Sequence, residues 1–254
     1  MGGSSSKNNF SNTIGAPGAP QVDNELEIDA DMEMLDLRLK KLTQLPWDLA
    51  VLSNLQELDL SMNSFQHIPE QCTWKDGHLA TSLTKLSFNQ NILARVSDDI
   101  GNMVKLRTLC CYDNRITTLP DSIKDMQSLT QLSLYNNMLT SLPDAFCEIP
   151  NLQLAYLSNN RIAQLPASVG KLQHLRGLYV DGNLLRELPQ SFFELPNLKE
   201  LTLVNNQFGE VPPELAQMAA LEEVYLNGAC GKKRVVVPEE ISKKGILKDC
   251  YEGQ

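Results

Sequence analysis

Apolar and polar positions along this chain recur every twenty-three residues. One copy of the pattern reads Leu129-x-x-Leu132-x-Leu134-x-x-Asn137-x-Leu139-x-x-Leu142-Pro143. Nine copies align, and they begin at Met32, Leu55, Leu83, Leu106, Leu129, Leu152, Leu175, Leu198 and Leu221. A fixed period of this length is typical of a solenoid, in which each repeat forms one coil against its neighbours.

The positions within one copy predict the elements of one coil. Side chains of a strand alternate between its two faces, so we expect positions four and six to enter the core. Positions three, five and seven then face away from it. A Leu-Pro pair follows in most copies, and proline suits an extended segment because it fixes φ and has no amide donor. An apolar pair spaced by three, such as Ile123 and Met126, favours a helical turn.

Position nine is asparagine in seven of the nine copies. These residues are Asn63, Asn91, Asn114, Asn137, Asn160, Asn183 and Asn206. At a tight bend after the strand, an amide side chain can satisfy backbone groups of its own coil and of the next one. We therefore expect a buried asparagine ladder along the solenoid. The first and last copies carry Lys40 and Ala229 instead, as end repeats often do.

The consensus over about residues 32–241 resembles that of the intracellular leucine-rich repeat proteins. Within them it is most similar to the Leu-Pro class of Ras-group and Shoc-type scaffolds. The resemblance implies an α/β solenoid: a right-handed horseshoe with a concave parallel β-sheet and short helical or extended segments on its convex side. It implies less about function, because one fold serves many functions.

Two copies are longer than the period. Extra residues fall in segment 70–78, which includes Trp74, and we interpret this segment as a surface bulge or a contact site. The last copy is also longer and carries the basic residues Lys232, Lys233 and Arg234. We expect an exposed loop there, with basic recognition as the alternative, and we interpret Val235 to Val237 as a closing apolar run.

Five of the six tyrosines occupy positions five and seven, on the face expected to point to solvent. Tyrosine buries apolar area and keeps a hydroxyl for hydrogen bonding, so it is enriched at interfaces. We expect four of them, on consecutive strands, to form one patch. The alternative is that tyrosine merely suits strands. The candidate partner-binding residues are Tyr112, Tyr135, Tyr156, Tyr179, Tyr225, Asp181, Arg107 and Arg176.

Composition restricts the partners and the compartment. The net charge of −9 makes nucleic acid an unfavourable partner. The six cysteines show no Cys-x-x-Cys spacing, which favours a reducing compartment. The chain has no run of eighteen apolar residues and no secretory signal. We therefore expect a cytoplasmic protein.

The sequence contains no recognisable catalytic set. His67, His78 and His174 show no zinc-ligand spacing, and no phosphate-binding loop is present. Asp36 and Asp59 align on neighbouring strands, where we expect an acidic rim. We thus predict a monomeric, non-catalytic scaffold of intracellular signalling without cofactor or metal. Its partner would be a protein, such as a small GTPase or a phosphatase. The alternative is a regulatory subunit of an enzyme such as a protein phosphatase.

Residues 1–31 differ in composition from the repeat domain expected over residues 32–254. The first part is rich in Gly, Ser, Asn and Pro and predicts disorder, and an acidic stretch follows it. Met1-Gly2-Gly3-Ser4-Ser5-Ser6 fits the N-myristoylation pattern, although it also reads as an ordinary linker. One myristoyl chain supports only weak, reversible association with the cytoplasmic face of a membrane.

If Gly2 is myristoylated, Gly2→Ala blocks acylation and moves the protein from the membrane fraction to the soluble fraction. The intact mass of the protein from its native cell shows whether the acyl group is present. A mass without an acyl group would leave residues 1–31 as a plain leader.

Overall fold

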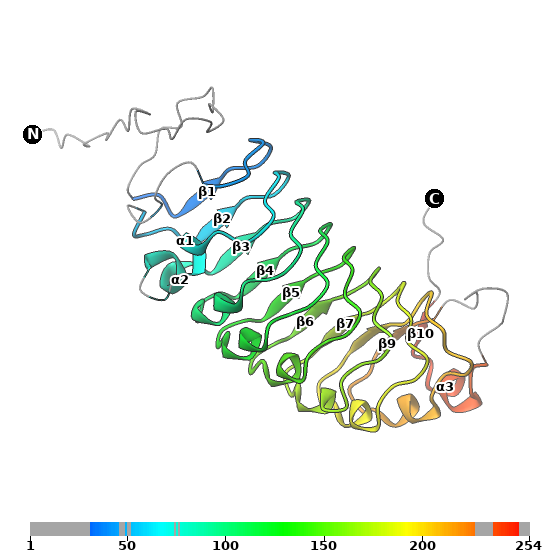
Figure 1. The fold of residues 1–254 in the computed structure, drawn as a ribbon. Helices are drawn as coiled ribbons and strands as arrows, with labels where there is room; N and C mark the ends of the chain where they lie inside the picture. The colour runs from blue at the N-terminus through cyan, green and yellow to red at the C-terminus, as the bar shows by residue number, and fades with distance from the viewer. Residues whose placement is uncertain are drawn as a thin grey trace, which may run out of the picture.

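The structure is a computed structural model that describes residues 31–45, 49, 52–73, 75, 77–226 and 236–248. Within these residues the chain forms one curved solenoid, with ten parallel strands that follow one another in chain order (Figure 1). The strands are β1 (Met34–Asp36), β2 (Glu57–Asp59), β3 (Lys85–Ser87), β4 (Thr108–Cys110), β5 (Gln131–Ser133), β6 (Leu154–Tyr156), β7 (Gly177–Tyr179), β8 (Glu200–Thr202), β9 (Glu223–Tyr225) and β10 (Leu247–Lys248). The expected horseshoe with a parallel sheet is confirmed.

The strands pair in the register that the repeat predicts. Position four of each copy lies beside position four of the next, as Leu109 lies beside Leu132 and Leu132 beside Ala155. These side chains are almost wholly buried, and positions one and six are buried with them, as at Leu129 and Leu134. One continuous apolar core therefore runs along the solenoid between the sheet and the convex side.

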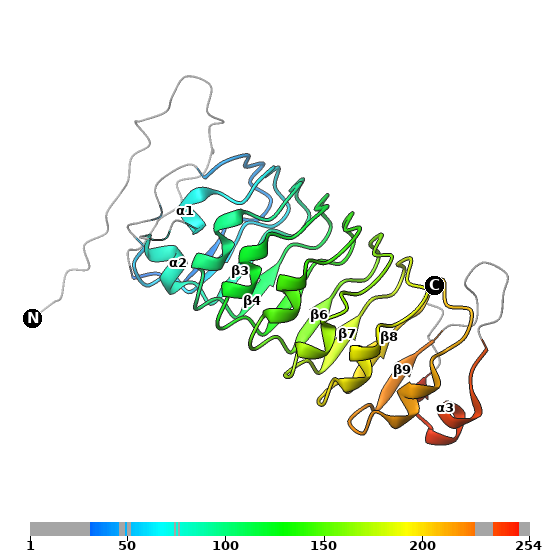
Figure 2. The ribbon, with the colours of Figure 1, turned by 60° about the horizontal axis from the view of Figure 1, so that its bottom comes forward.

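The convex side consists largely of single turns of 3-10 helix (Figure 2). They are η2 (Asp98–Asn102), η3 (Asp121–Asp125), η4 (Asp144–Glu148), η5 (Val169–Lys171), η6 (Gln190–Glu194) and η7 (Pro213–Gln217). Pro120, Pro143 and Pro189 each directly precede a turn in extended conformation, with φ between −76° and −66°. The predicted order of strand, bend, extended proline segment and helical turn is confirmed.

The insertion at residues 70–78 does not form a plain surface bulge. It contributes to two short helices, α1 (Glu70–Thr73) and α2 (His78–Ser82), which bury Cys72 and Leu79 in the core. The amide of Asn102 donates to the Thr73 carbonyl at 3.0 Å and ties α1 to the next coil. The insertion is thus a packed part of the convex side. Trp74 lies outside the described residues.

Helix α3 (Glu239–Lys244) and β10 cover the last coil. Ile241 and Ile246 are buried there and extend the core. The expectation of a closing run at Val235 to Val237 is wrong for the two described residues, because Val236 is 58% exposed and Val237 is 37% exposed. Val235, the basic residues 232–234, Ala229 and the whole segment 1–30 lie outside the described residues.

The asparagine ladder is present in all seven copies that carry the residue. Asn137 is typical: its Nδ2 donates to the carbonyls of Cys111 in the preceding coil at 2.9 Å and of Leu134 in its own coil at 3.0 Å. Its Oδ1 accepts from the amide of Ile116, also in the preceding coil, at 2.9 Å. Each asparagine therefore fastens two neighbouring coils together.

Position eight, directly before each asparagine, has a conformational role that the repeat pattern did not reveal. Its backbone is left-handed in eight copies, at Leu39, Met62, Gln90, Asp113, Asn136, Asn159, Gly182 and Asn205. Asn, Asp and Gly tolerate this conformation best, which accounts for most of the column. The side chains also form a second ladder on the surface: Asn136 donates to Asp113 at 2.6 Å, and Asn159 donates to Asn136 at 2.8 Å.

We predict that Asn137→Ala lowers the free energy of unfolding by about 1–3 kcal/mol, because it leaves the buried amide of Ile116 without a partner. It also removes one of the two side-chain donors to each of the carbonyls of Cys111 and Leu134. Chemical denaturation measures the loss. Gln127→Ala, at an exposed position of the preceding copy, is a control that should change stability by less than about 0.5 kcal/mol. A variant at position 137 as stable as the wild type would contradict the ladder.

Candidate functional site

The tyrosines singled out by their positions line the concave face, where they form two stacked pairs. Tyr112 stacks on Tyr135 with ring centroids 4.4 Å apart and planes 10° from parallel. Tyr156 stacks on Tyr179 with centroids 4.6 Å apart and planes 5° from parallel. All four side chains are half-buried rather than freely exposed. Stacked aromatic pairs add roughly 0.5–1.5 kcal/mol beyond their buried area.

The first pair lies just beyond the strands, at position seven. Tyr112 and Tyr135 follow β4 and β5 by two residues. Burial, and then the neighbouring Tyr112 hydroxyl, raise the pKa of Tyr135 to about 12. The Tyr135 phenol therefore stays neutral at physiological pH and can act as a hydrogen-bond donor. Position five beside them carries the small residues Ser87, Cys110 and Ser133.

The second pair lies on the strands themselves, at position five of β6 and β7. The Tyr179 hydroxyl donates to the Oε2 atom of Glu200 on β8. Burial, and then this hydrogen bond, raise the pKa of Tyr179 well above its ordinary value. The tyrosines thus shift from position seven to position five between β5 and β6, so the expected single patch is two pairs in two columns.

Gly177 provides the space that the second pair occupies. A Cβ atom at this position would lie 2.9 Å from Cε2 and 3.0 Å from the hydroxyl oxygen of Tyr179. The ring of Tyr179 therefore leans back along β7 and covers its first residue. Sequence reasoning did not single out Gly177, although it is the sole glycine at position three in the nine copies.

Tyr225 stands apart from the two pairs, on β9. Its hydroxyl donates to Glu223 of the same strand at 2.8 Å. Glu223 also forms an ion pair with Lys248 of β10 at 3.6 Å. Tyr225 is therefore part of the same concave face, two strands beyond Tyr179.

The three charged candidates have different surroundings. Asp181 accepts hydrogen bonds from Ser158 at 3.1 Å, from the hydroxyl of Thr202, and from the amide of Val204 at 3.1 Å. It joins three consecutive coils and so has a structural role in addition to any role in binding. Arg107 and Arg176 are exposed at the entry of β4 and β7, on the rim of the concave face.

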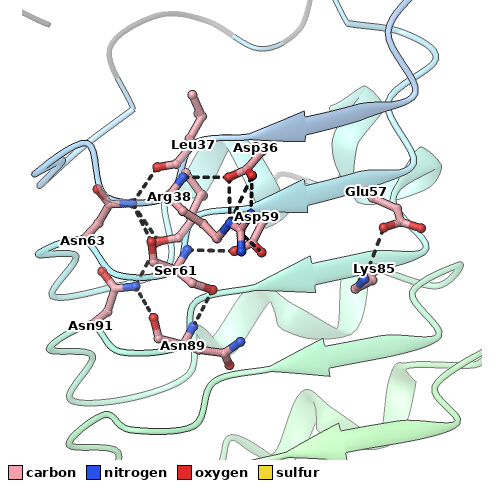
Figure 3. Close-up of polar contacts among 11 residues, drawn as sticks. Asp36, Leu37, Arg38, Glu57, Asp59, Ser61, Asn63, Lys85, Asn89 and Asn91 are labelled. Carbon is pink, nitrogen blue, oxygen red and sulfur yellow. Dashed lines mark hydrogen bonds and ion pairs between the residues drawn. The ribbon is translucent and has the colours of Figure 1, made fainter.

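Charged side chains at the N-terminal end of the concave face form ion pairs with one another (Figure 3). Arg38 binds Asp36 through Nε at 3.0 Å and a terminal nitrogen at 2.7 Å, and its Nε lies 3.8 Å from Asp59. Hydrogen bonding from Arg38 holds the pKa of Asp36 below its usual value. Lys85 pairs with Glu57 at 3.3 Å. The acidic rim expected at Asp36 and Asp59 is thus neutralised by an arginine that sequence reasoning did not connect to it.

The described part of the chain offers no evident reaction centre. Four cysteines are free there, and burial raises the pKa of Cys72 to about 12 and of Cys147 to about 11, so these thiols stay protonated. Among the described residues, no group of three His, Cys, Asp or Glu side chains lies close enough to hold a metal ion. No helix of the described residues has the length and apolar character needed to cross a membrane.

We predict that Gly177→Ala displaces the Tyr179 ring and breaks its bond to Glu200, because a Cβ atom leaves no room for the ring. The pKa of Tyr179 should fall toward its ordinary value as the ring becomes solvated, which a pH titration followed by carbon NMR of the tyrosine rings would measure. Stability should fall by no more than about 1.5 kcal/mol, the value of a lost stack.

Gly209→Ala is a matched control, since a Cβ atom there would meet nothing within 4 Å. It should leave the tyrosine titrations as in the wild type. An unchanged Tyr179 titration in Gly177→Ala would show that the ring does not depend on this glycine.

Comparisons with known proteins agree with the geometry. The leucine-rich repeat family matches residues 105–162, 150–208, 173–229 and 54–74, together more than half of the chain. No curated protein matches the chain significantly.

Similar solved structures come from bacteria and other sources. A leucine-rich repeat protein of Leptospira interrogans has 26% identity and a TM-score of 0.63, covering 87% of this chain and 66% of its own. Internalin C2 of Listeria monocytogenes has 26% identity and a TM-score of 0.64, with 78% and 83% covered. The repeat domain of the type III effector XopL, at 22% identity and a TM-score of 0.70 with 86% and 77% covered, shares the fold.

The chain spans just under two thirds of the length of the Leptospira protein. The repeat columns, the parallel sheet and the family match lead to one conclusion: the chain belongs to the leucine-rich repeat proteins.

Proposed function

We propose that this protein is a non-catalytic scaffold that binds a protein partner on the concave face, through the tyrosine pairs. The observation that carries the proposal is the presence of four half-buried, stacked tyrosines on the concave face. Their side chains are not part of the apolar core. The solenoid packs through positions one, four and six, so small polar residues could occupy the tyrosine positions without loss of the core.

The stacked arrangement suits binding because the rings are ordered before a partner arrives. Free side chains lose conformational entropy when an interface immobilises them, at a cost of about 0.5–1.5 kcal/mol each. Rings that already stack, with Tyr179 also bonded to Glu200, lose less. Tyrosine and tryptophan dominate interface hot spots for related reasons.

The setting that we propose is intracellular signalling. The Leu-Pro repeats resemble those of Ras-group and Shoc-type scaffolds, and the scattered cysteines suit a reducing compartment. Residues 32–254 would then be one repeat domain, and residues 1–31 a leader with a myristoylation pattern at Gly2. A small GTPase or a phosphatase fits this setting as a partner.

We predict that Tyr156→Ala weakens binding of the captured partner by roughly 2 kcal/mol or more, the range of an interface hot spot. The free energy of unfolding of the Tyr156→Ala variant should fall by about 0.5–1.5 kcal/mol, because the variant loses the stack on Tyr179. The partner is first identified by affinity capture from native cells, and its affinity is then measured on purified proteins beside the melting temperature.

Leu157→Ala, one residue along the chain, is the matched control. Leu157 is fully buried, so its truncation should cost about 2–5 kcal/mol of stability through a core cavity. Binding measured below its melting temperature should stay near that of the wild type. Normal binding by Tyr156→Ala, together with lost binding by Trp74→Ala, would place recognition in the inserted segment and contradict the concave site.

A further inference from the structure

Arginines gather on one edge of the solenoid, between the bend and the convex turns. Positions ten, twelve and thirteen lie on this edge, and we call these positions in the five copies of residues 83–197 the arginine edge. It carries Arg115 and Arg161 at position ten, Arg186 at position twelve and Arg95 at position thirteen, all exposed. The same five copies contain six arginines and four lysines, and every lysine lies outside this edge. The edge therefore carries arginine in preference to lysine.

The arginine edge is positively charged on a protein whose net charge is −9. Among its positions, Glu187 is the one acidic residue. The exposed carboxylates of these copies lie largely on the convex turns, as do Asp121 and Asp125 of η3 and Asp144 and Glu148 of η4. A basic surface and an acidic surface thus follow each other along each coil.

The guanidinium groups of the arginine edge have few partners within this protein. Arg186 donates from Nε to the side-chain oxygen of Gln207 at 3.1 Å. In the part of the chain that the structure describes, the side chains of Arg95, Arg115 and Arg161 form no hydrogen bond or ion pair. A guanidinium carries five N–H donors in a planar fork that matches a carboxylate. Three such forks are therefore available to a ligand.

Position ten alternates between cationic and apolar side chains. In chain order the column reads Ile92, Arg115, Met138, Arg161 and Leu184. Met138 is half-buried and Leu184 is 42% exposed. The backbone amides of this column donate to the preceding coil at 2.8 to 3.1 Å, so neighbouring members are spaced like paired strands, about 4.8 Å apart. Arg115 and Arg161 therefore lie roughly 9.6 Å apart, with Met138 between them.

Small side chains lie beside this column at position twelve. They are Ala94, Thr117, Thr140 and Ala163 in the first four of the five copies, and all four are exposed. Because these side chains are short, they do not obstruct a chain that approaches the arginines of position ten. An extended segment can therefore lie over position twelve and reach that column.

Going beyond the concave face, we propose that the arginine edge binds an extended acidic segment of a partner protein. Carboxylates of the segment accept hydrogen bonds from Arg115 and Arg161, and such charge-assisted bonds are stronger than neutral ones. An apolar residue between the carboxylates contacts Met138, and a further apolar residue contacts Leu184. Burial of this apolar surface adds to the affinity.

The alternating column favours a peptide over a nucleic acid. A nucleic-acid backbone carries a charge at every phosphate and offers no apolar group to Met138 or Leu184. It would also extend past the acidic convex turns, whose carboxylates repel it. A short peptide confines its carboxylates to the edge and places apolar side chains between them.

The test uses the full-length protein and a tetramethylrhodamine-labelled peptide in which glutamate alternates with leucine. A second peptide has glutamine in place of each glutamate. Fluorescence anisotropy should show that the glutamate peptide binds roughly tenfold more tightly than the glutamine peptide. Equal affinities, or no binding of the glutamate peptide, would overturn the proposal. Tighter binding of a labelled thymidine oligonucleotide than of the glutamate peptide would show a nucleic-acid surface and would also overturn it.

Three variants locate the peptide. Arg115→Gln and Arg161→Gln should each weaken the glutamate peptide by roughly fivefold. Lys124→Gln removes the same charge from an exposed position on η3 and should change binding by less than about twofold. All three should melt like the wild type, because their side chains are exposed and form no hydrogen bond or ion pair among the described residues. Full binding by both arginine variants, or an equal loss in Lys124→Gln, would contradict the arginine edge.

The two proposed surfaces are tested separately. Tyr156→Ala lies on the concave face and should bind the glutamate peptide as the wild type does; loss of the peptide in this variant would contradict the arginine edge. If the peptides show no charge preference while Tyr156→Ala still loses the captured partner, the arginine edge is wrong and the concave scaffold stands. If Tyr156→Ala binds the captured partner normally, the concave scaffold fails whatever the peptides do.

Discussion

The asparagine side chain at position nine is the interaction on which the rest of this structure depends. One amide group donates to carbonyls of its own and the preceding coil and accepts from an amide of the preceding coil, as at Asn137 and Asn160. These groups are buried at the bend, where water cannot replace the asparagine. Apolar burial supplies most of the driving force for folding, but it is non-directional. The directional asparagine bonds set how each coil meets the next.

The regular register has a direct consequence for the concave face. Because each coil repeats the last with a fixed offset, equivalent side chains lie in straight columns about 4.8 Å apart. This spacing is close to that of stacked aromatic rings, so tyrosines at equivalent positions of neighbouring coils stack, as both pairs do. At β8, Thr202 stands in this column in place of a tyrosine, between Tyr179 and Tyr225. The side chains that line the concave face can therefore change one residue at a time without a change in the register of the coils.

Sequence reasoning recovered the parts of the fold that repeat. The apolar positions, the asparagines and the Leu-Pro pairs predicted the strands, the ladder and the convex turns, because a periodic signal reports directly on a periodic structure. The packing of the insertion was missed, since burial of Cys72 and Leu79 in two short helices has no period to reveal it. The left-handed backbone at position eight was missed too. The sequence carries a signal for it, because Asp113, Asn136, Asn159 and Asn205 are residues that tolerate this conformation.

The residues of the candidate site on the concave face were predictable as a set, but their arrangement was not. The columns placed the tyrosines on one face, but their division into two pairs follows from how each ring leans. That depends on neighbours such as Gly177, whose missing Cβ leaves room for Tyr179. The pairing of Arg38 with Asp36 and Asp59 also depends on side-chain direction, which spacing alone does not give.

The most direct test of the ladder is native-state hydrogen exchange of the amides that donate to asparagine Oδ1. The buried ones are the amides of Phe65, Leu93, Ile116, Leu139, Ile162 and Leu185. If the ladder holds the coils in register, they exchange only through openings that involve whole coils, with protection close to that of the core strands. Exchange as fast as that of exposed loop amides would contradict this account, because the ladder would then be open in the native protein.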